Sequence, residues 1–222
     1  MAKDILNLLI YKIHDGALQK KIAKYFKGEM IDIGCGLKPY KDMCAPYIKN
    51  HLGIDHPGSM HAKTQIDSFA VAYGLPFKEG TFDSALSTCV LEHLEEPQIA
   101  IDECFRVLKP GGHTIFSVPF IWHLHEEPRD FFRYSKYGLE YIFKKAGFEI
   151  VEIDALSGFW VTFGQLLMYN LYRFNRSIIR WLHIMDLIAL IVFGIVYLLE
   201  KIDKTEKWTW CYLIVAKKPE NP

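Results

Sequence analysis

Short apolar runs recur along most of the chain, and segments with apolar residues at helical spacing separate them. The runs have the length and composition of buried strands, whereas the segments near 97–107 and 135–146 have the period of amphipathic helices. Alternation of this kind predicts a parallel sheet covered by helices on both faces. The expected strands are Met30–Ile33, His51–Asp55, Phe82–Ser87, His113–Val118 and Phe148–Ile153.

Two parts of the chain depart from this alternation. Residues 3–26 have the pattern of one or two amphipathic helices. Residues 155–207 contain two apolar segments, 159–172 and 178–199, and then the chain resumes with a last strand, Trp210–Ala216. We therefore expect a helical insertion before the last strand of the sheet.

The first strand ends in Asp32-Ile33-Gly34-Cys35-Gly36, and a second acid, Asp55, ends the next strand. A buried parallel strand that turns at glycine brings backbone N–H groups against a nucleotide-like ligand, and an acid after the next strand can accept both ribose hydroxyls. Gly-x-Gly also marks ordinary turns, and Lys38 stands where a dinucleotide-binding loop has its next glycine. The pair of features still favours a nucleoside cofactor.

Further motifs follow in order: Leu75-Pro76-Phe77, Leu91-Glu92-His93 and Leu108-Lys109-Pro110-Gly111-Gly112. With the glycine loop, they make the chain resemble the class I S-adenosylmethionine-dependent methyltransferases over about residues 28–154 and again near 209–217. The resemblance implies a Rossmann-like three-layer α/β sandwich with a mostly parallel seven-stranded sheet and an antiparallel last strand. It divides the chain into N-terminal helices (1–27), a methyltransferase domain (28–154 and 208–218) and the apolar insertion (155–207).

The resemblance also indicates which residues bind S-adenosylmethionine. Asp32 would order the glycine loop, Asp55 would hold the ribose, and Cys35 would contribute mainly its N–H. Val71 stands where the family usually has an acid for the adenine amino group, and Asp67 lies four residues too early to replace it. The expected cofactor-binding residues are Asp32, Gly34, Cys35, Gly36, Asp55, Leu75 and Cys89, and Glu92 and His93 are expected to fix the loop that contains them.

The loop after the fifth strand, residues 119–135, is dense in ionisable and aromatic side chains and leaves the sheet beside the expected cofactor. Histidine has the basicity to take a proton from an acceptor hydroxyl, so we expect His125 as base or acceptor ligand, with His123 and Glu126 as further catalytic residues. Metal coordination by these histidines and the acids near them matches no recognised zinc spacing, and we predict no metal site. Asp130 and Arg133 can pin the loop to a helix capped by Ser135.

Composition limits the classes of substrate and the cellular compartments that fit this protein. Lys plus Arg and Asp plus Glu both number 26, so no net positive charge gathers nucleic acid, and we expect no nucleic-acid substrate. The five cysteines show no Cys-x-x-Cys spacing, which argues against a disulfide framework and favours a reducing cytoplasm. The N-terminus lacks the pattern of a secretion signal.

The apolar segments of the insertion are compatible with contact between the protein and a membrane. Its longest apolar run, Leu187–Leu199, would be about 20 Å long as a helix, against a hydrocarbon core of about 30 Å. Strands before and after the insertion join one sheet, so a single crossing is excluded. We expect peripheral contact through residues 155–207, with arginines facing phosphates, on the inner face of the membrane. The alternatives are a cover over the active site and a homodimer interface.

Together these features predict a methyltransferase that acts on a small or lipid-linked acceptor, by O-methylation of a glycan or an amphipathic intermediate. The loop 119–135 resembles loops in bacterial relatives associated with surface glycan biosynthesis. Two alternatives stay open: an NAD(P)- or nucleotide-sugar-binding oxidoreductase, and a noncatalytic membrane-associated cofactor-binding protein. An oxidoreductase would be expected to have the glycine that Lys38 replaces. A noncatalytic protein would not be expected to have a loop so rich in ionisable side chains.

Overall fold

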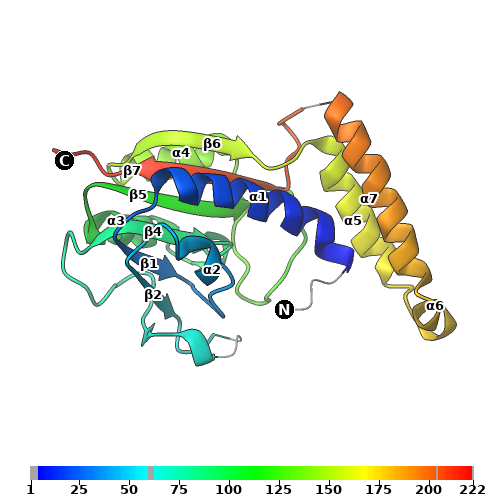
Figure 1. Cartoon of the computed structure of the whole chain (residues 1–222), viewed down its shortest axis with the longest axis horizontal. Helices are drawn as coiled ribbons and strands as arrows, with labels where there is room; N and C mark the ends of the chain where they lie inside the picture. The colour runs from blue at the N-terminus through cyan, green and yellow to red at the C-terminus, as the bar shows by residue number, and fades with distance from the viewer. Residues whose placement is uncertain (1–4, 60–62, 204, 222) are drawn as a thin grey trace. The chain divides into compact units, whose positions relative to one another are not determined.

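The computed structural model describes residues 5–59, 63–203 and 205–221, and these residues form two compact units (Figure 1). The sheet unit contains the described residues of 18–119, 124–154 and 212–221. The helical unit contains those of 5–17, 120–123 and 155–211. The start of the chain and a short segment after the fifth strand thus belong with the insertion. The functional division predicted from the sequence stays a prediction.

Seven strands form one sheet in the order β3-β2-β1-β4-β5-β7-β6. β1 is parallel to β2 and β4, β2 to β3, and β4 to β5. Gly111 donates to Lys218, Lys218 donates back to Gly112, and Phe120 donates to Trp210, so β7 runs antiparallel to β5. The predicted sheet is confirmed. The strands are β1 Glu29–Ile33, β2 Asn50–Asp55, β3 Ser68–Phe69, β4 Phe82–Thr88, β5 Leu108–Pro119, β6 Glu149–Ala155 and β7 Cys211–Lys217.

The order of strands reverses between β1 and β4, which lie side by side in the sheet. In open α/β sheets, ligands bind beyond the carboxyl ends of the strands at such a switch point. The glycine loop leaves β1 there, and the segment that contains Glu92 and His93 leaves β4 beside it. The fold therefore brings the two motifs to the same edge of the sheet.

Strand β5 begins earlier than the sequence indicated. The Leu108-Lys109-Pro110-Gly111-Gly112 segment, which precedes the predicted strand His113–Val118, is part of β5. The pairing with β4 jumps there, since Phe82 faces Leu108 while Ser84 faces His113, and Gly111 has a φ of 75°. The extra residues form an irregularity in which glycine supplies the left-handed backbone.

Helices flank the sheet, and the sequence located them closely (Figure 1). The Ser135 side chain accepts a hydrogen bond from the Gly138 N–H at 3.2 Å, which confirms Ser135 as an N-cap. The helix α1 contributes its first part to the helical unit and its second part to the sheet unit. The helices of the sheet unit are α1 Leu8–Tyr25 in part, α2 Lys41–Cys44, α3 Pro97–Val107 and α4 Lys136–Lys145, with 3-10 turns η2 Lys63–Gln65 and η3 Leu91–His93.

Glu152 on β6 connects the second part of α1 to the sheet. Its carboxylate accepts hydrogen bonds from Lys21, Lys24 and Tyr25. These bonds, with that of Lys21 the strongest, lower the pKa of Glu152 from 4.5 to about 2. Burial acts in the opposite direction.

Replacing Glu152 with glutamine is expected to lower stability at pH 7. Because the folded pKa is depressed, the ionised carboxylate contributes stability above the unfolded pKa of about 4.3, and that contribution is lost as the pH falls toward about 2. The difference in urea midpoint between wild type and Glu152→Gln should therefore shrink between pH 4.5 and pH 2. Glu149→Gln, an exposed change on the same strand, is the control, and a pH-independent difference for Glu152→Gln would contradict the account.

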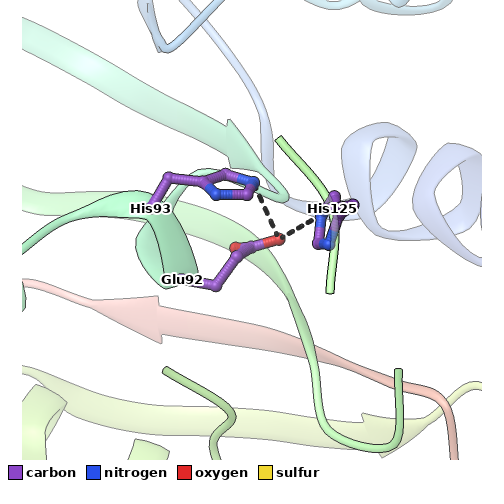
Figure 2. Close-up of side chains that lie close together, drawn as sticks. All are labelled: Glu92, His93 and His125. Carbon is purple, nitrogen blue, oxygen red and sulfur yellow. Dashed lines mark ion pairs between the residues drawn. The ribbon is translucent and has the colours of Figure 1, made fainter. Parts of the chain in front are cut away.

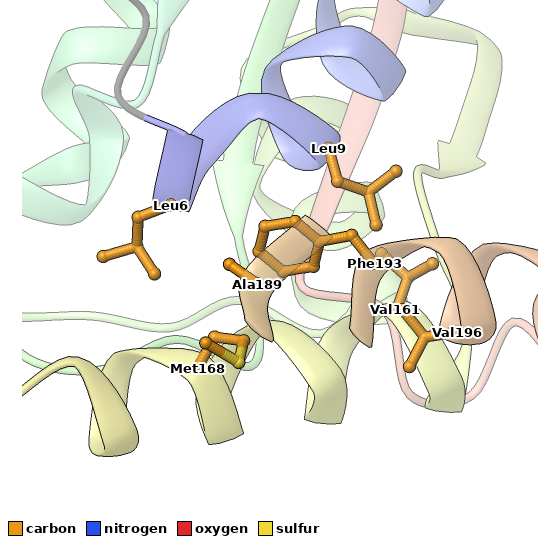
Figure 3. Packing of buried hydrophobic residues seen from close by; sticks show 7 residues of the cluster. All are labelled: Leu6, Leu9, Val161, Met168, Ala189, Phe193 and Val196. Carbon is orange, nitrogen blue, oxygen red and sulfur yellow. The ribbon is translucent and has the colours of Figure 1, made fainter. Parts of the chain in front are cut away.

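The helical unit has an apolar core of its own (Figure 3). Its helices are α5 Phe159–Tyr172, α6 Ser177–Trp181 and α7 Ile184–Ile202, with the 3-10 turn η1 Ile5–Asn7. α5 and α7 pack closely at Gly164, where a Cβ would lie 2.7 Å from Val196 Cγ1. The buried residues of this core are Leu6, Leu9, Val161, Met168, Ala189, Phe193 and Val196.

Polar contacts add to this core. Glu200 of α7 accepts hydrogen bonds from the N–H groups of Gly158 and Val161 at the start of α5. A carboxylate at a helix N-terminus satisfies free N–H groups and interacts favourably with the helix dipole. Gln165 donates to the Leu6 carbonyl at 2.7 Å, and Tyr169 donates to Asn7. These bonds hold the start of the chain against the insertion.

The predicted apolar segment 178–199 is not one helix. His183 adopts a left-handed backbone (φ 52°) and separates α6 from α7. The apolar period alone could not show this break, because apolar residues continue on both sides of it. Among the described residues, no helix is both long enough and apolar enough to cross a membrane.

Candidate functional site

The glycine loop after β1 has the backbone that its sequence predicts. Gly34 and Gly36 have φ values of 76° and 49°, a region that favours glycine. A Cβ on Gly34 would lie 2.4 Å from Val90 Cγ2, so the loop packs directly on the segment that follows β4. Glycine is therefore required at position 34 both for the turn and for this close approach.

Asp55, at the end of β2, is held in place by backbone N–H groups. Gly36 donates to its Oδ2 at 2.8 Å, and His56 donates to its Oδ1 at 2.7 Å. The side chain is 9% exposed. Each carboxylate oxygen has a second lone pair, so an oriented Asp55 can accept two further hydrogen bonds, as from a pair of vicinal hydroxyls.

Asp32, at the end of β1, is buried and lies against a histidine that sequence reasoning missed. Its Oδ2 is 2.9 Å from His51 Nε2 on the neighbouring strand. Burial raises the pKa of Asp32, while His51 opposes the rise. His51 reaches Asp32 because of the strand register, in which Met30 faces His51 and Asp32 faces Gly53. The sequence alone does not show this register.

Lys38, which replaces the third glycine of a dinucleotide-binding loop, has a left-handed backbone of its own (φ 48°). Its side chain crosses Gly53, where a Cβ would lie 2.2 Å from Lys38 Cε. The ammonium group bonds to Asp67 and donates to the His51 carbonyl at 3.2 Å. Asp67 also accepts from the Gly53 N–H at 2.7 Å, so it is engaged in holding the loop and β2 together.

Two further predicted cofactor-binding residues, Leu75 and Cys89, lie where the chain turns after its strands. Leu75 is 4% exposed, and its N–H donates to Glu103 at 2.7 Å. Cys89, directly after β4, has a φ of 52°, and its N–H donates to the Ser117 carbonyl. A left-handed backbone on a non-glycine residue is costly and is often found at functional sites.

Cys35 requires a correction. The sequence analysis assigned its N–H to the ligand, but both the Cys35 and the Gly34 N–H groups donate to the Ile54 carbonyl at 2.9 Å. This carbonyl belongs to the second-last residue of β2 and accepts the N–H groups of the neighbouring loop. Burial raises the pKa of the Cys35 thiol to about 12, so the thiol stays protonated at neutral pH.

Glu92, His93 and His125 form a cluster beyond the carboxyl ends of β4 and β5 (Figure 2). Glu92 Oε1 lies 3.7 Å from His93 Nε2 and 3.8 Å from His125 Nε2. The two imidazoles meet edge to face with ring centroids 4.8 Å apart. Parallel neighbouring strands bring loops that are far apart in the sequence to one place.

Glu92 differs from the role expected of it. Its backbone carbonyl does fix the loop, because Phe131 and Phe132 donate to it. Its side chain, however, is 0% exposed, and neither carboxylate oxygen has a hydrogen-bond partner. Burial raises the pKa of this carboxyl well above its ordinary value. A buried acid without partners is a candidate functional group.

The Asp130–Arg133 pair supports the loop that contains His125. Arg133 donates to both carboxylate oxygens of Asp130, at 2.6 and 2.7 Å, and the His125 N–H donates to Asp130 at 2.9 Å. The Arg133 guanidinium lowers the pKa of Asp130 below its ordinary range. Asp130 and Arg133 thus pin the loop, which is the structural role that the sequence analysis gave them.

The other two predicted catalytic residues have different positions. Glu126 follows His125 in the sheet unit, and its Oε2 lies 3.9 Å from His93 Nε2. His123 belongs to the helical unit, where its ring centroid is 4.6 Å from that of Tyr169 and 5.1 Å from that of Trp122. His125 and Glu126 therefore lie at the cluster, while His123 belongs to an aromatic group in the other unit. The catalytic roles of all three stay predictions.

Comparisons with known proteins agree with this geometry. Residues 31–116 match a family model described as "Methyltransferase domain". The chain is 25% identical over 115 residues to a protein of Mycolicibacterium smegmatis named "Probable S-adenosylmethionine-dependent methyltransferase", covering 49% of this chain and 45% of that protein. It is 26% identical over 127 residues to a ubiquinone biosynthesis O-methyltransferase of Pseudomonas fluorescens, covering 52% of each. The chain thus spans about half the length of these curated relatives.

Among solved structures, the [4+2]-cyclase SpnF is similar with a TM-score of 0.62 and 21% identity. The match covers 91% of this chain and 81% of that structure. At this identity the similarity concerns the fold alone, and a fold can support more than one chemistry.

Proposed function

We propose that this chain, which carries a class I S-adenosylmethionine-dependent methyltransferase domain, transfers the methyl group of S-adenosylmethionine to a hydroxyl oxygen of a small or lipid-linked acceptor. The observation that carries the proposal is the meeting of two groups at one sheet edge. The glycine loop and Asp55 follow β1 and β2, and the Glu92, His93 and His125 cluster follows β4 and β5.

The residues present fit the cofactor. Asp55 is oriented to accept from both ribose hydroxyls, and the left-handed Gly34 and Gly36 place no side chains at their own positions in the loop. Leu75 and Cys89 would border the adenine and methionine parts. S-adenosylmethionine supplies an activated methyl group on a sulfonium, so the protein needs mainly to align the acceptor and exclude water.

The acceptor side has the groups that a hydroxyl needs. His125 contributes an imidazole on the acceptor side, and Asp130 with Arg133 holds its loop. Glu126 Oε2 lies 3.9 Å from His93 Nε2 in the same cluster. The similarity to an O-methyltransferase supports an oxygen acceptor, and the balance of 26 basic and 26 acidic residues argues against nucleic acid. We propose a glycan or an amphipathic intermediate as the acceptor.

Calorimetry with three ligands tests the cofactor. The protein should bind S-adenosylmethionine and S-adenosylhomocysteine with micromolar or lower dissociation constants and show no heat with NAD. Binding of NAD with rejection of S-adenosylmethionine would instead support the oxidoreductase alternative. Binding of S-adenosylmethionine without turnover on any acceptor would support a noncatalytic protein.

The helical unit supports a location at the membrane surface. One side of α7 faces the core, while the other presents an apolar stripe to solvent. Arg173 and Arg176 in the turn after α5, and Arg180 on α6, can face anionic headgroups, and Trp181 is 74% exposed. We propose peripheral contact at the cytoplasmic face of the membrane. The exposed stripe consists of Leu187, Leu190, Ile191, Ile195, Leu198 and Ile202.

Liposome flotation tests this contact. Wild-type protein should float with vesicles that contain anionic lipid and stay behind with neutral vesicles, because both the stripe and the basic charge contribute. Reversing the charge at Arg173, Arg176 and Arg180 should abolish flotation. Reversal at Lys12, Lys20 and Lys136 is the control. Unchanged flotation after the arginine reversal would contradict the role given to these arginines. No flotation of wild type would contradict membrane contact and favour a homodimer interface or a cover over the site.

A further inference from the structure

We propose that Glu92, His93 and His125 bind a divalent transition-metal cation through one carboxylate oxygen and two imidazole nitrogens, and that this cation holds the acceptor oxygen. The binding site itself stands on geometry alone, while its use in methyl transfer rests on the proposed function. The sequence analysis predicted no metal. The three ligands come from two segments that are far apart in the sequence, so no motif with a fixed spacing identifies them.

The three ligand atoms have the separations that a shared cation requires. They all lie within 4.8 Å of one another, and the two distances to Glu92 Oε1 are 3.7 and 3.8 Å. A tetrahedral cation with ligands about 2.1 Å away holds those ligands about 3.4 Å apart. The two separations from Glu92 Oε1 exceed this value by a few tenths of an ångström, and rotation of the imidazoles would bring their two nitrogens closer together. Figure 2 shows the three side chains converging.

The burial of Glu92 is a second observation that supports a cation, independent of the distances. Its side chain is fully buried, and neither of its oxygens receives a hydrogen bond. Buried polar groups in proteins are nearly always paired, because desolvation without compensation is costly. The distances from Glu92 Oε1 to the two imidazole nitrogens are too long for hydrogen bonds and suit a cation between them.

The histidines are oriented as metal ligands are. His93 Nδ1 lies 2.5 Å from the Arg129 carbonyl, and since a carbonyl only accepts, Nδ1 carries the proton and Nε2 has a lone pair directed toward Glu92. His125 Nε2 also faces Glu92, and its Nδ1 lies 3.4 Å from Asp130 Oδ2 and 3.4 Å from Arg133 Nη2. In metal sites the second ring nitrogen of a ligating histidine commonly faces a carbonyl or a carboxylate.

The ligand set indicates the class of cation and its use. Two imidazoles and one carboxylate suit Zn²⁺, Mn²⁺ or Fe²⁺ better than Mg²⁺, which prefers oxygen ligands. Three protein ligands leave coordination positions open for the acceptor. A hydroxyl bound there loses its proton to water more readily, and its oxygen then forms the bond to the methyl carbon while the electron pair of the broken S–C bond stays on sulfur.

The test is metal binding by protein that has been stripped with a chelator and dialysed. Calorimetry with Zn²⁺ and with Mn²⁺ should show one site per chain, and Mg²⁺ should bind at least about 100-fold more weakly. Glu92→Gln and His125→Ala should each weaken Zn²⁺ binding about 100-fold or more. Glu127→Gln is the matched control, since Glu127 is an exposed acid in the loop that contains His125. This variant should bind Zn²⁺ as wild type does.

Thermal unfolding gives a second readout in the same variants. Zn²⁺ should raise the midpoint of wild type and of Glu127→Gln but not that of Glu92→Gln. Without metal, Glu92→Gln should unfold at the wild-type midpoint or above it, because it removes an unpaired buried acid. Absence of a Zn²⁺ or Mn²⁺ site in wild type, Mg²⁺ binding of equal strength, or unchanged Zn²⁺ binding in Glu92→Gln would overturn the proposal.

Binding of S-adenosylmethionine, measured in the same samples, separates this proposal from the proposed function. Protein that binds S-adenosylmethionine but no cation contradicts the metal site alone. Protein that binds the cation but no S-adenosylmethionine contradicts the methyltransferase function and leaves the cation site supported.

Discussion

Replacing Asp55 with alanine is expected to weaken S-adenosylmethionine binding about 100-fold or more. The carboxylate would accept two hydrogen bonds from the ribose, and a hydrogen bond to a charged group contributes about 1.5–3 kcal/mol, so losing two costs at least about 3 kcal/mol. The change also removes the acceptor for the Gly36 N–H, which bonds to Asp55 at 2.8 Å and orders the glycine loop. Calorimetric titration with S-adenosylmethionine measures the effect.

Two further variants make the Asp55 result specific. Asp42→Ala, the same change at an exposed acid of α2, should leave binding as in wild type. Asp55→Asn keeps one carbonyl oxygen for the Gly36 N–H and should bind more tightly than Asp55→Ala but more weakly than wild type. Wild-type affinity in Asp55→Ala would show that the ligand does not contact the end of β2.

Replacing His125 with alanine is expected to lower the methyl transfer rate, kcat, about 100- to 1000-fold. A positioned group that handles the acceptor proton typically contributes a factor of 10² to 10⁴, and loss of a cation ligand acts in the same direction. His125 lies in the loop after β5, whereas the expected cofactor residues lie at the ends of β1 and β2 and after β1, β3 and β4. The affinity for S-adenosylmethionine should therefore stay within about threefold of wild type.

The split between rate and affinity separates this role from a structural one. A variant that merely loosens the loop would raise KM for the acceptor and lower the thermal midpoint together. Adding imidazole to His125→Ala should restore part of the rate, since the vacated space can take the free base. His183→Ala, at a histidine that is 78% exposed, is the control. An unchanged kcat in His125→Ala would remove His125 from the mechanism.

Strand positions and the order of motifs were predictable because each depends on local information. A buried parallel strand such as β1 appears as a continuous apolar run, and glycine at positions 34 and 36 signals a left-handed turn. The N-cap at Ser135 is also a local feature. These elements fix where the strands end, and hence where the site lies.

Features that depend on pairing could not be predicted. Pro110-Gly111-Gly112 has the composition of a turn, yet pairing with β4 and β7 keeps it in β5 as an irregularity. The Cys35 N–H was free to meet a ligand in the sequence analysis, but the Ile54 carbonyl on the neighbouring strand accepts it. Tertiary context decided both cases.

The same limit applies to the candidate site. Glu92 was interpreted as a loop-fixing residue, and only the structure shows that it is a buried acid beside His93 and His125 without a hydrogen-bond partner. The left-handed His183 divides an apolar segment that has a continuous hydrophobic pattern. Burial and backbone conformation at single residues are set by the packed structure, and sequence periodicity does not report them.

The most direct test of the account is transfer of a labelled methyl group from S-adenosylmethionine to cell extracts separated into lipid, glycan, small-molecule, protein and nucleic-acid fractions. We expect label in the lipid, glycan or small-molecule fraction with wild type, released as methyl iodide by hydriodic acid, which cleaves methyl ethers, and none above background with Asp55→Ala. Label confined to protein or nucleic acid, or equal label with Asp55→Ala, would contradict it.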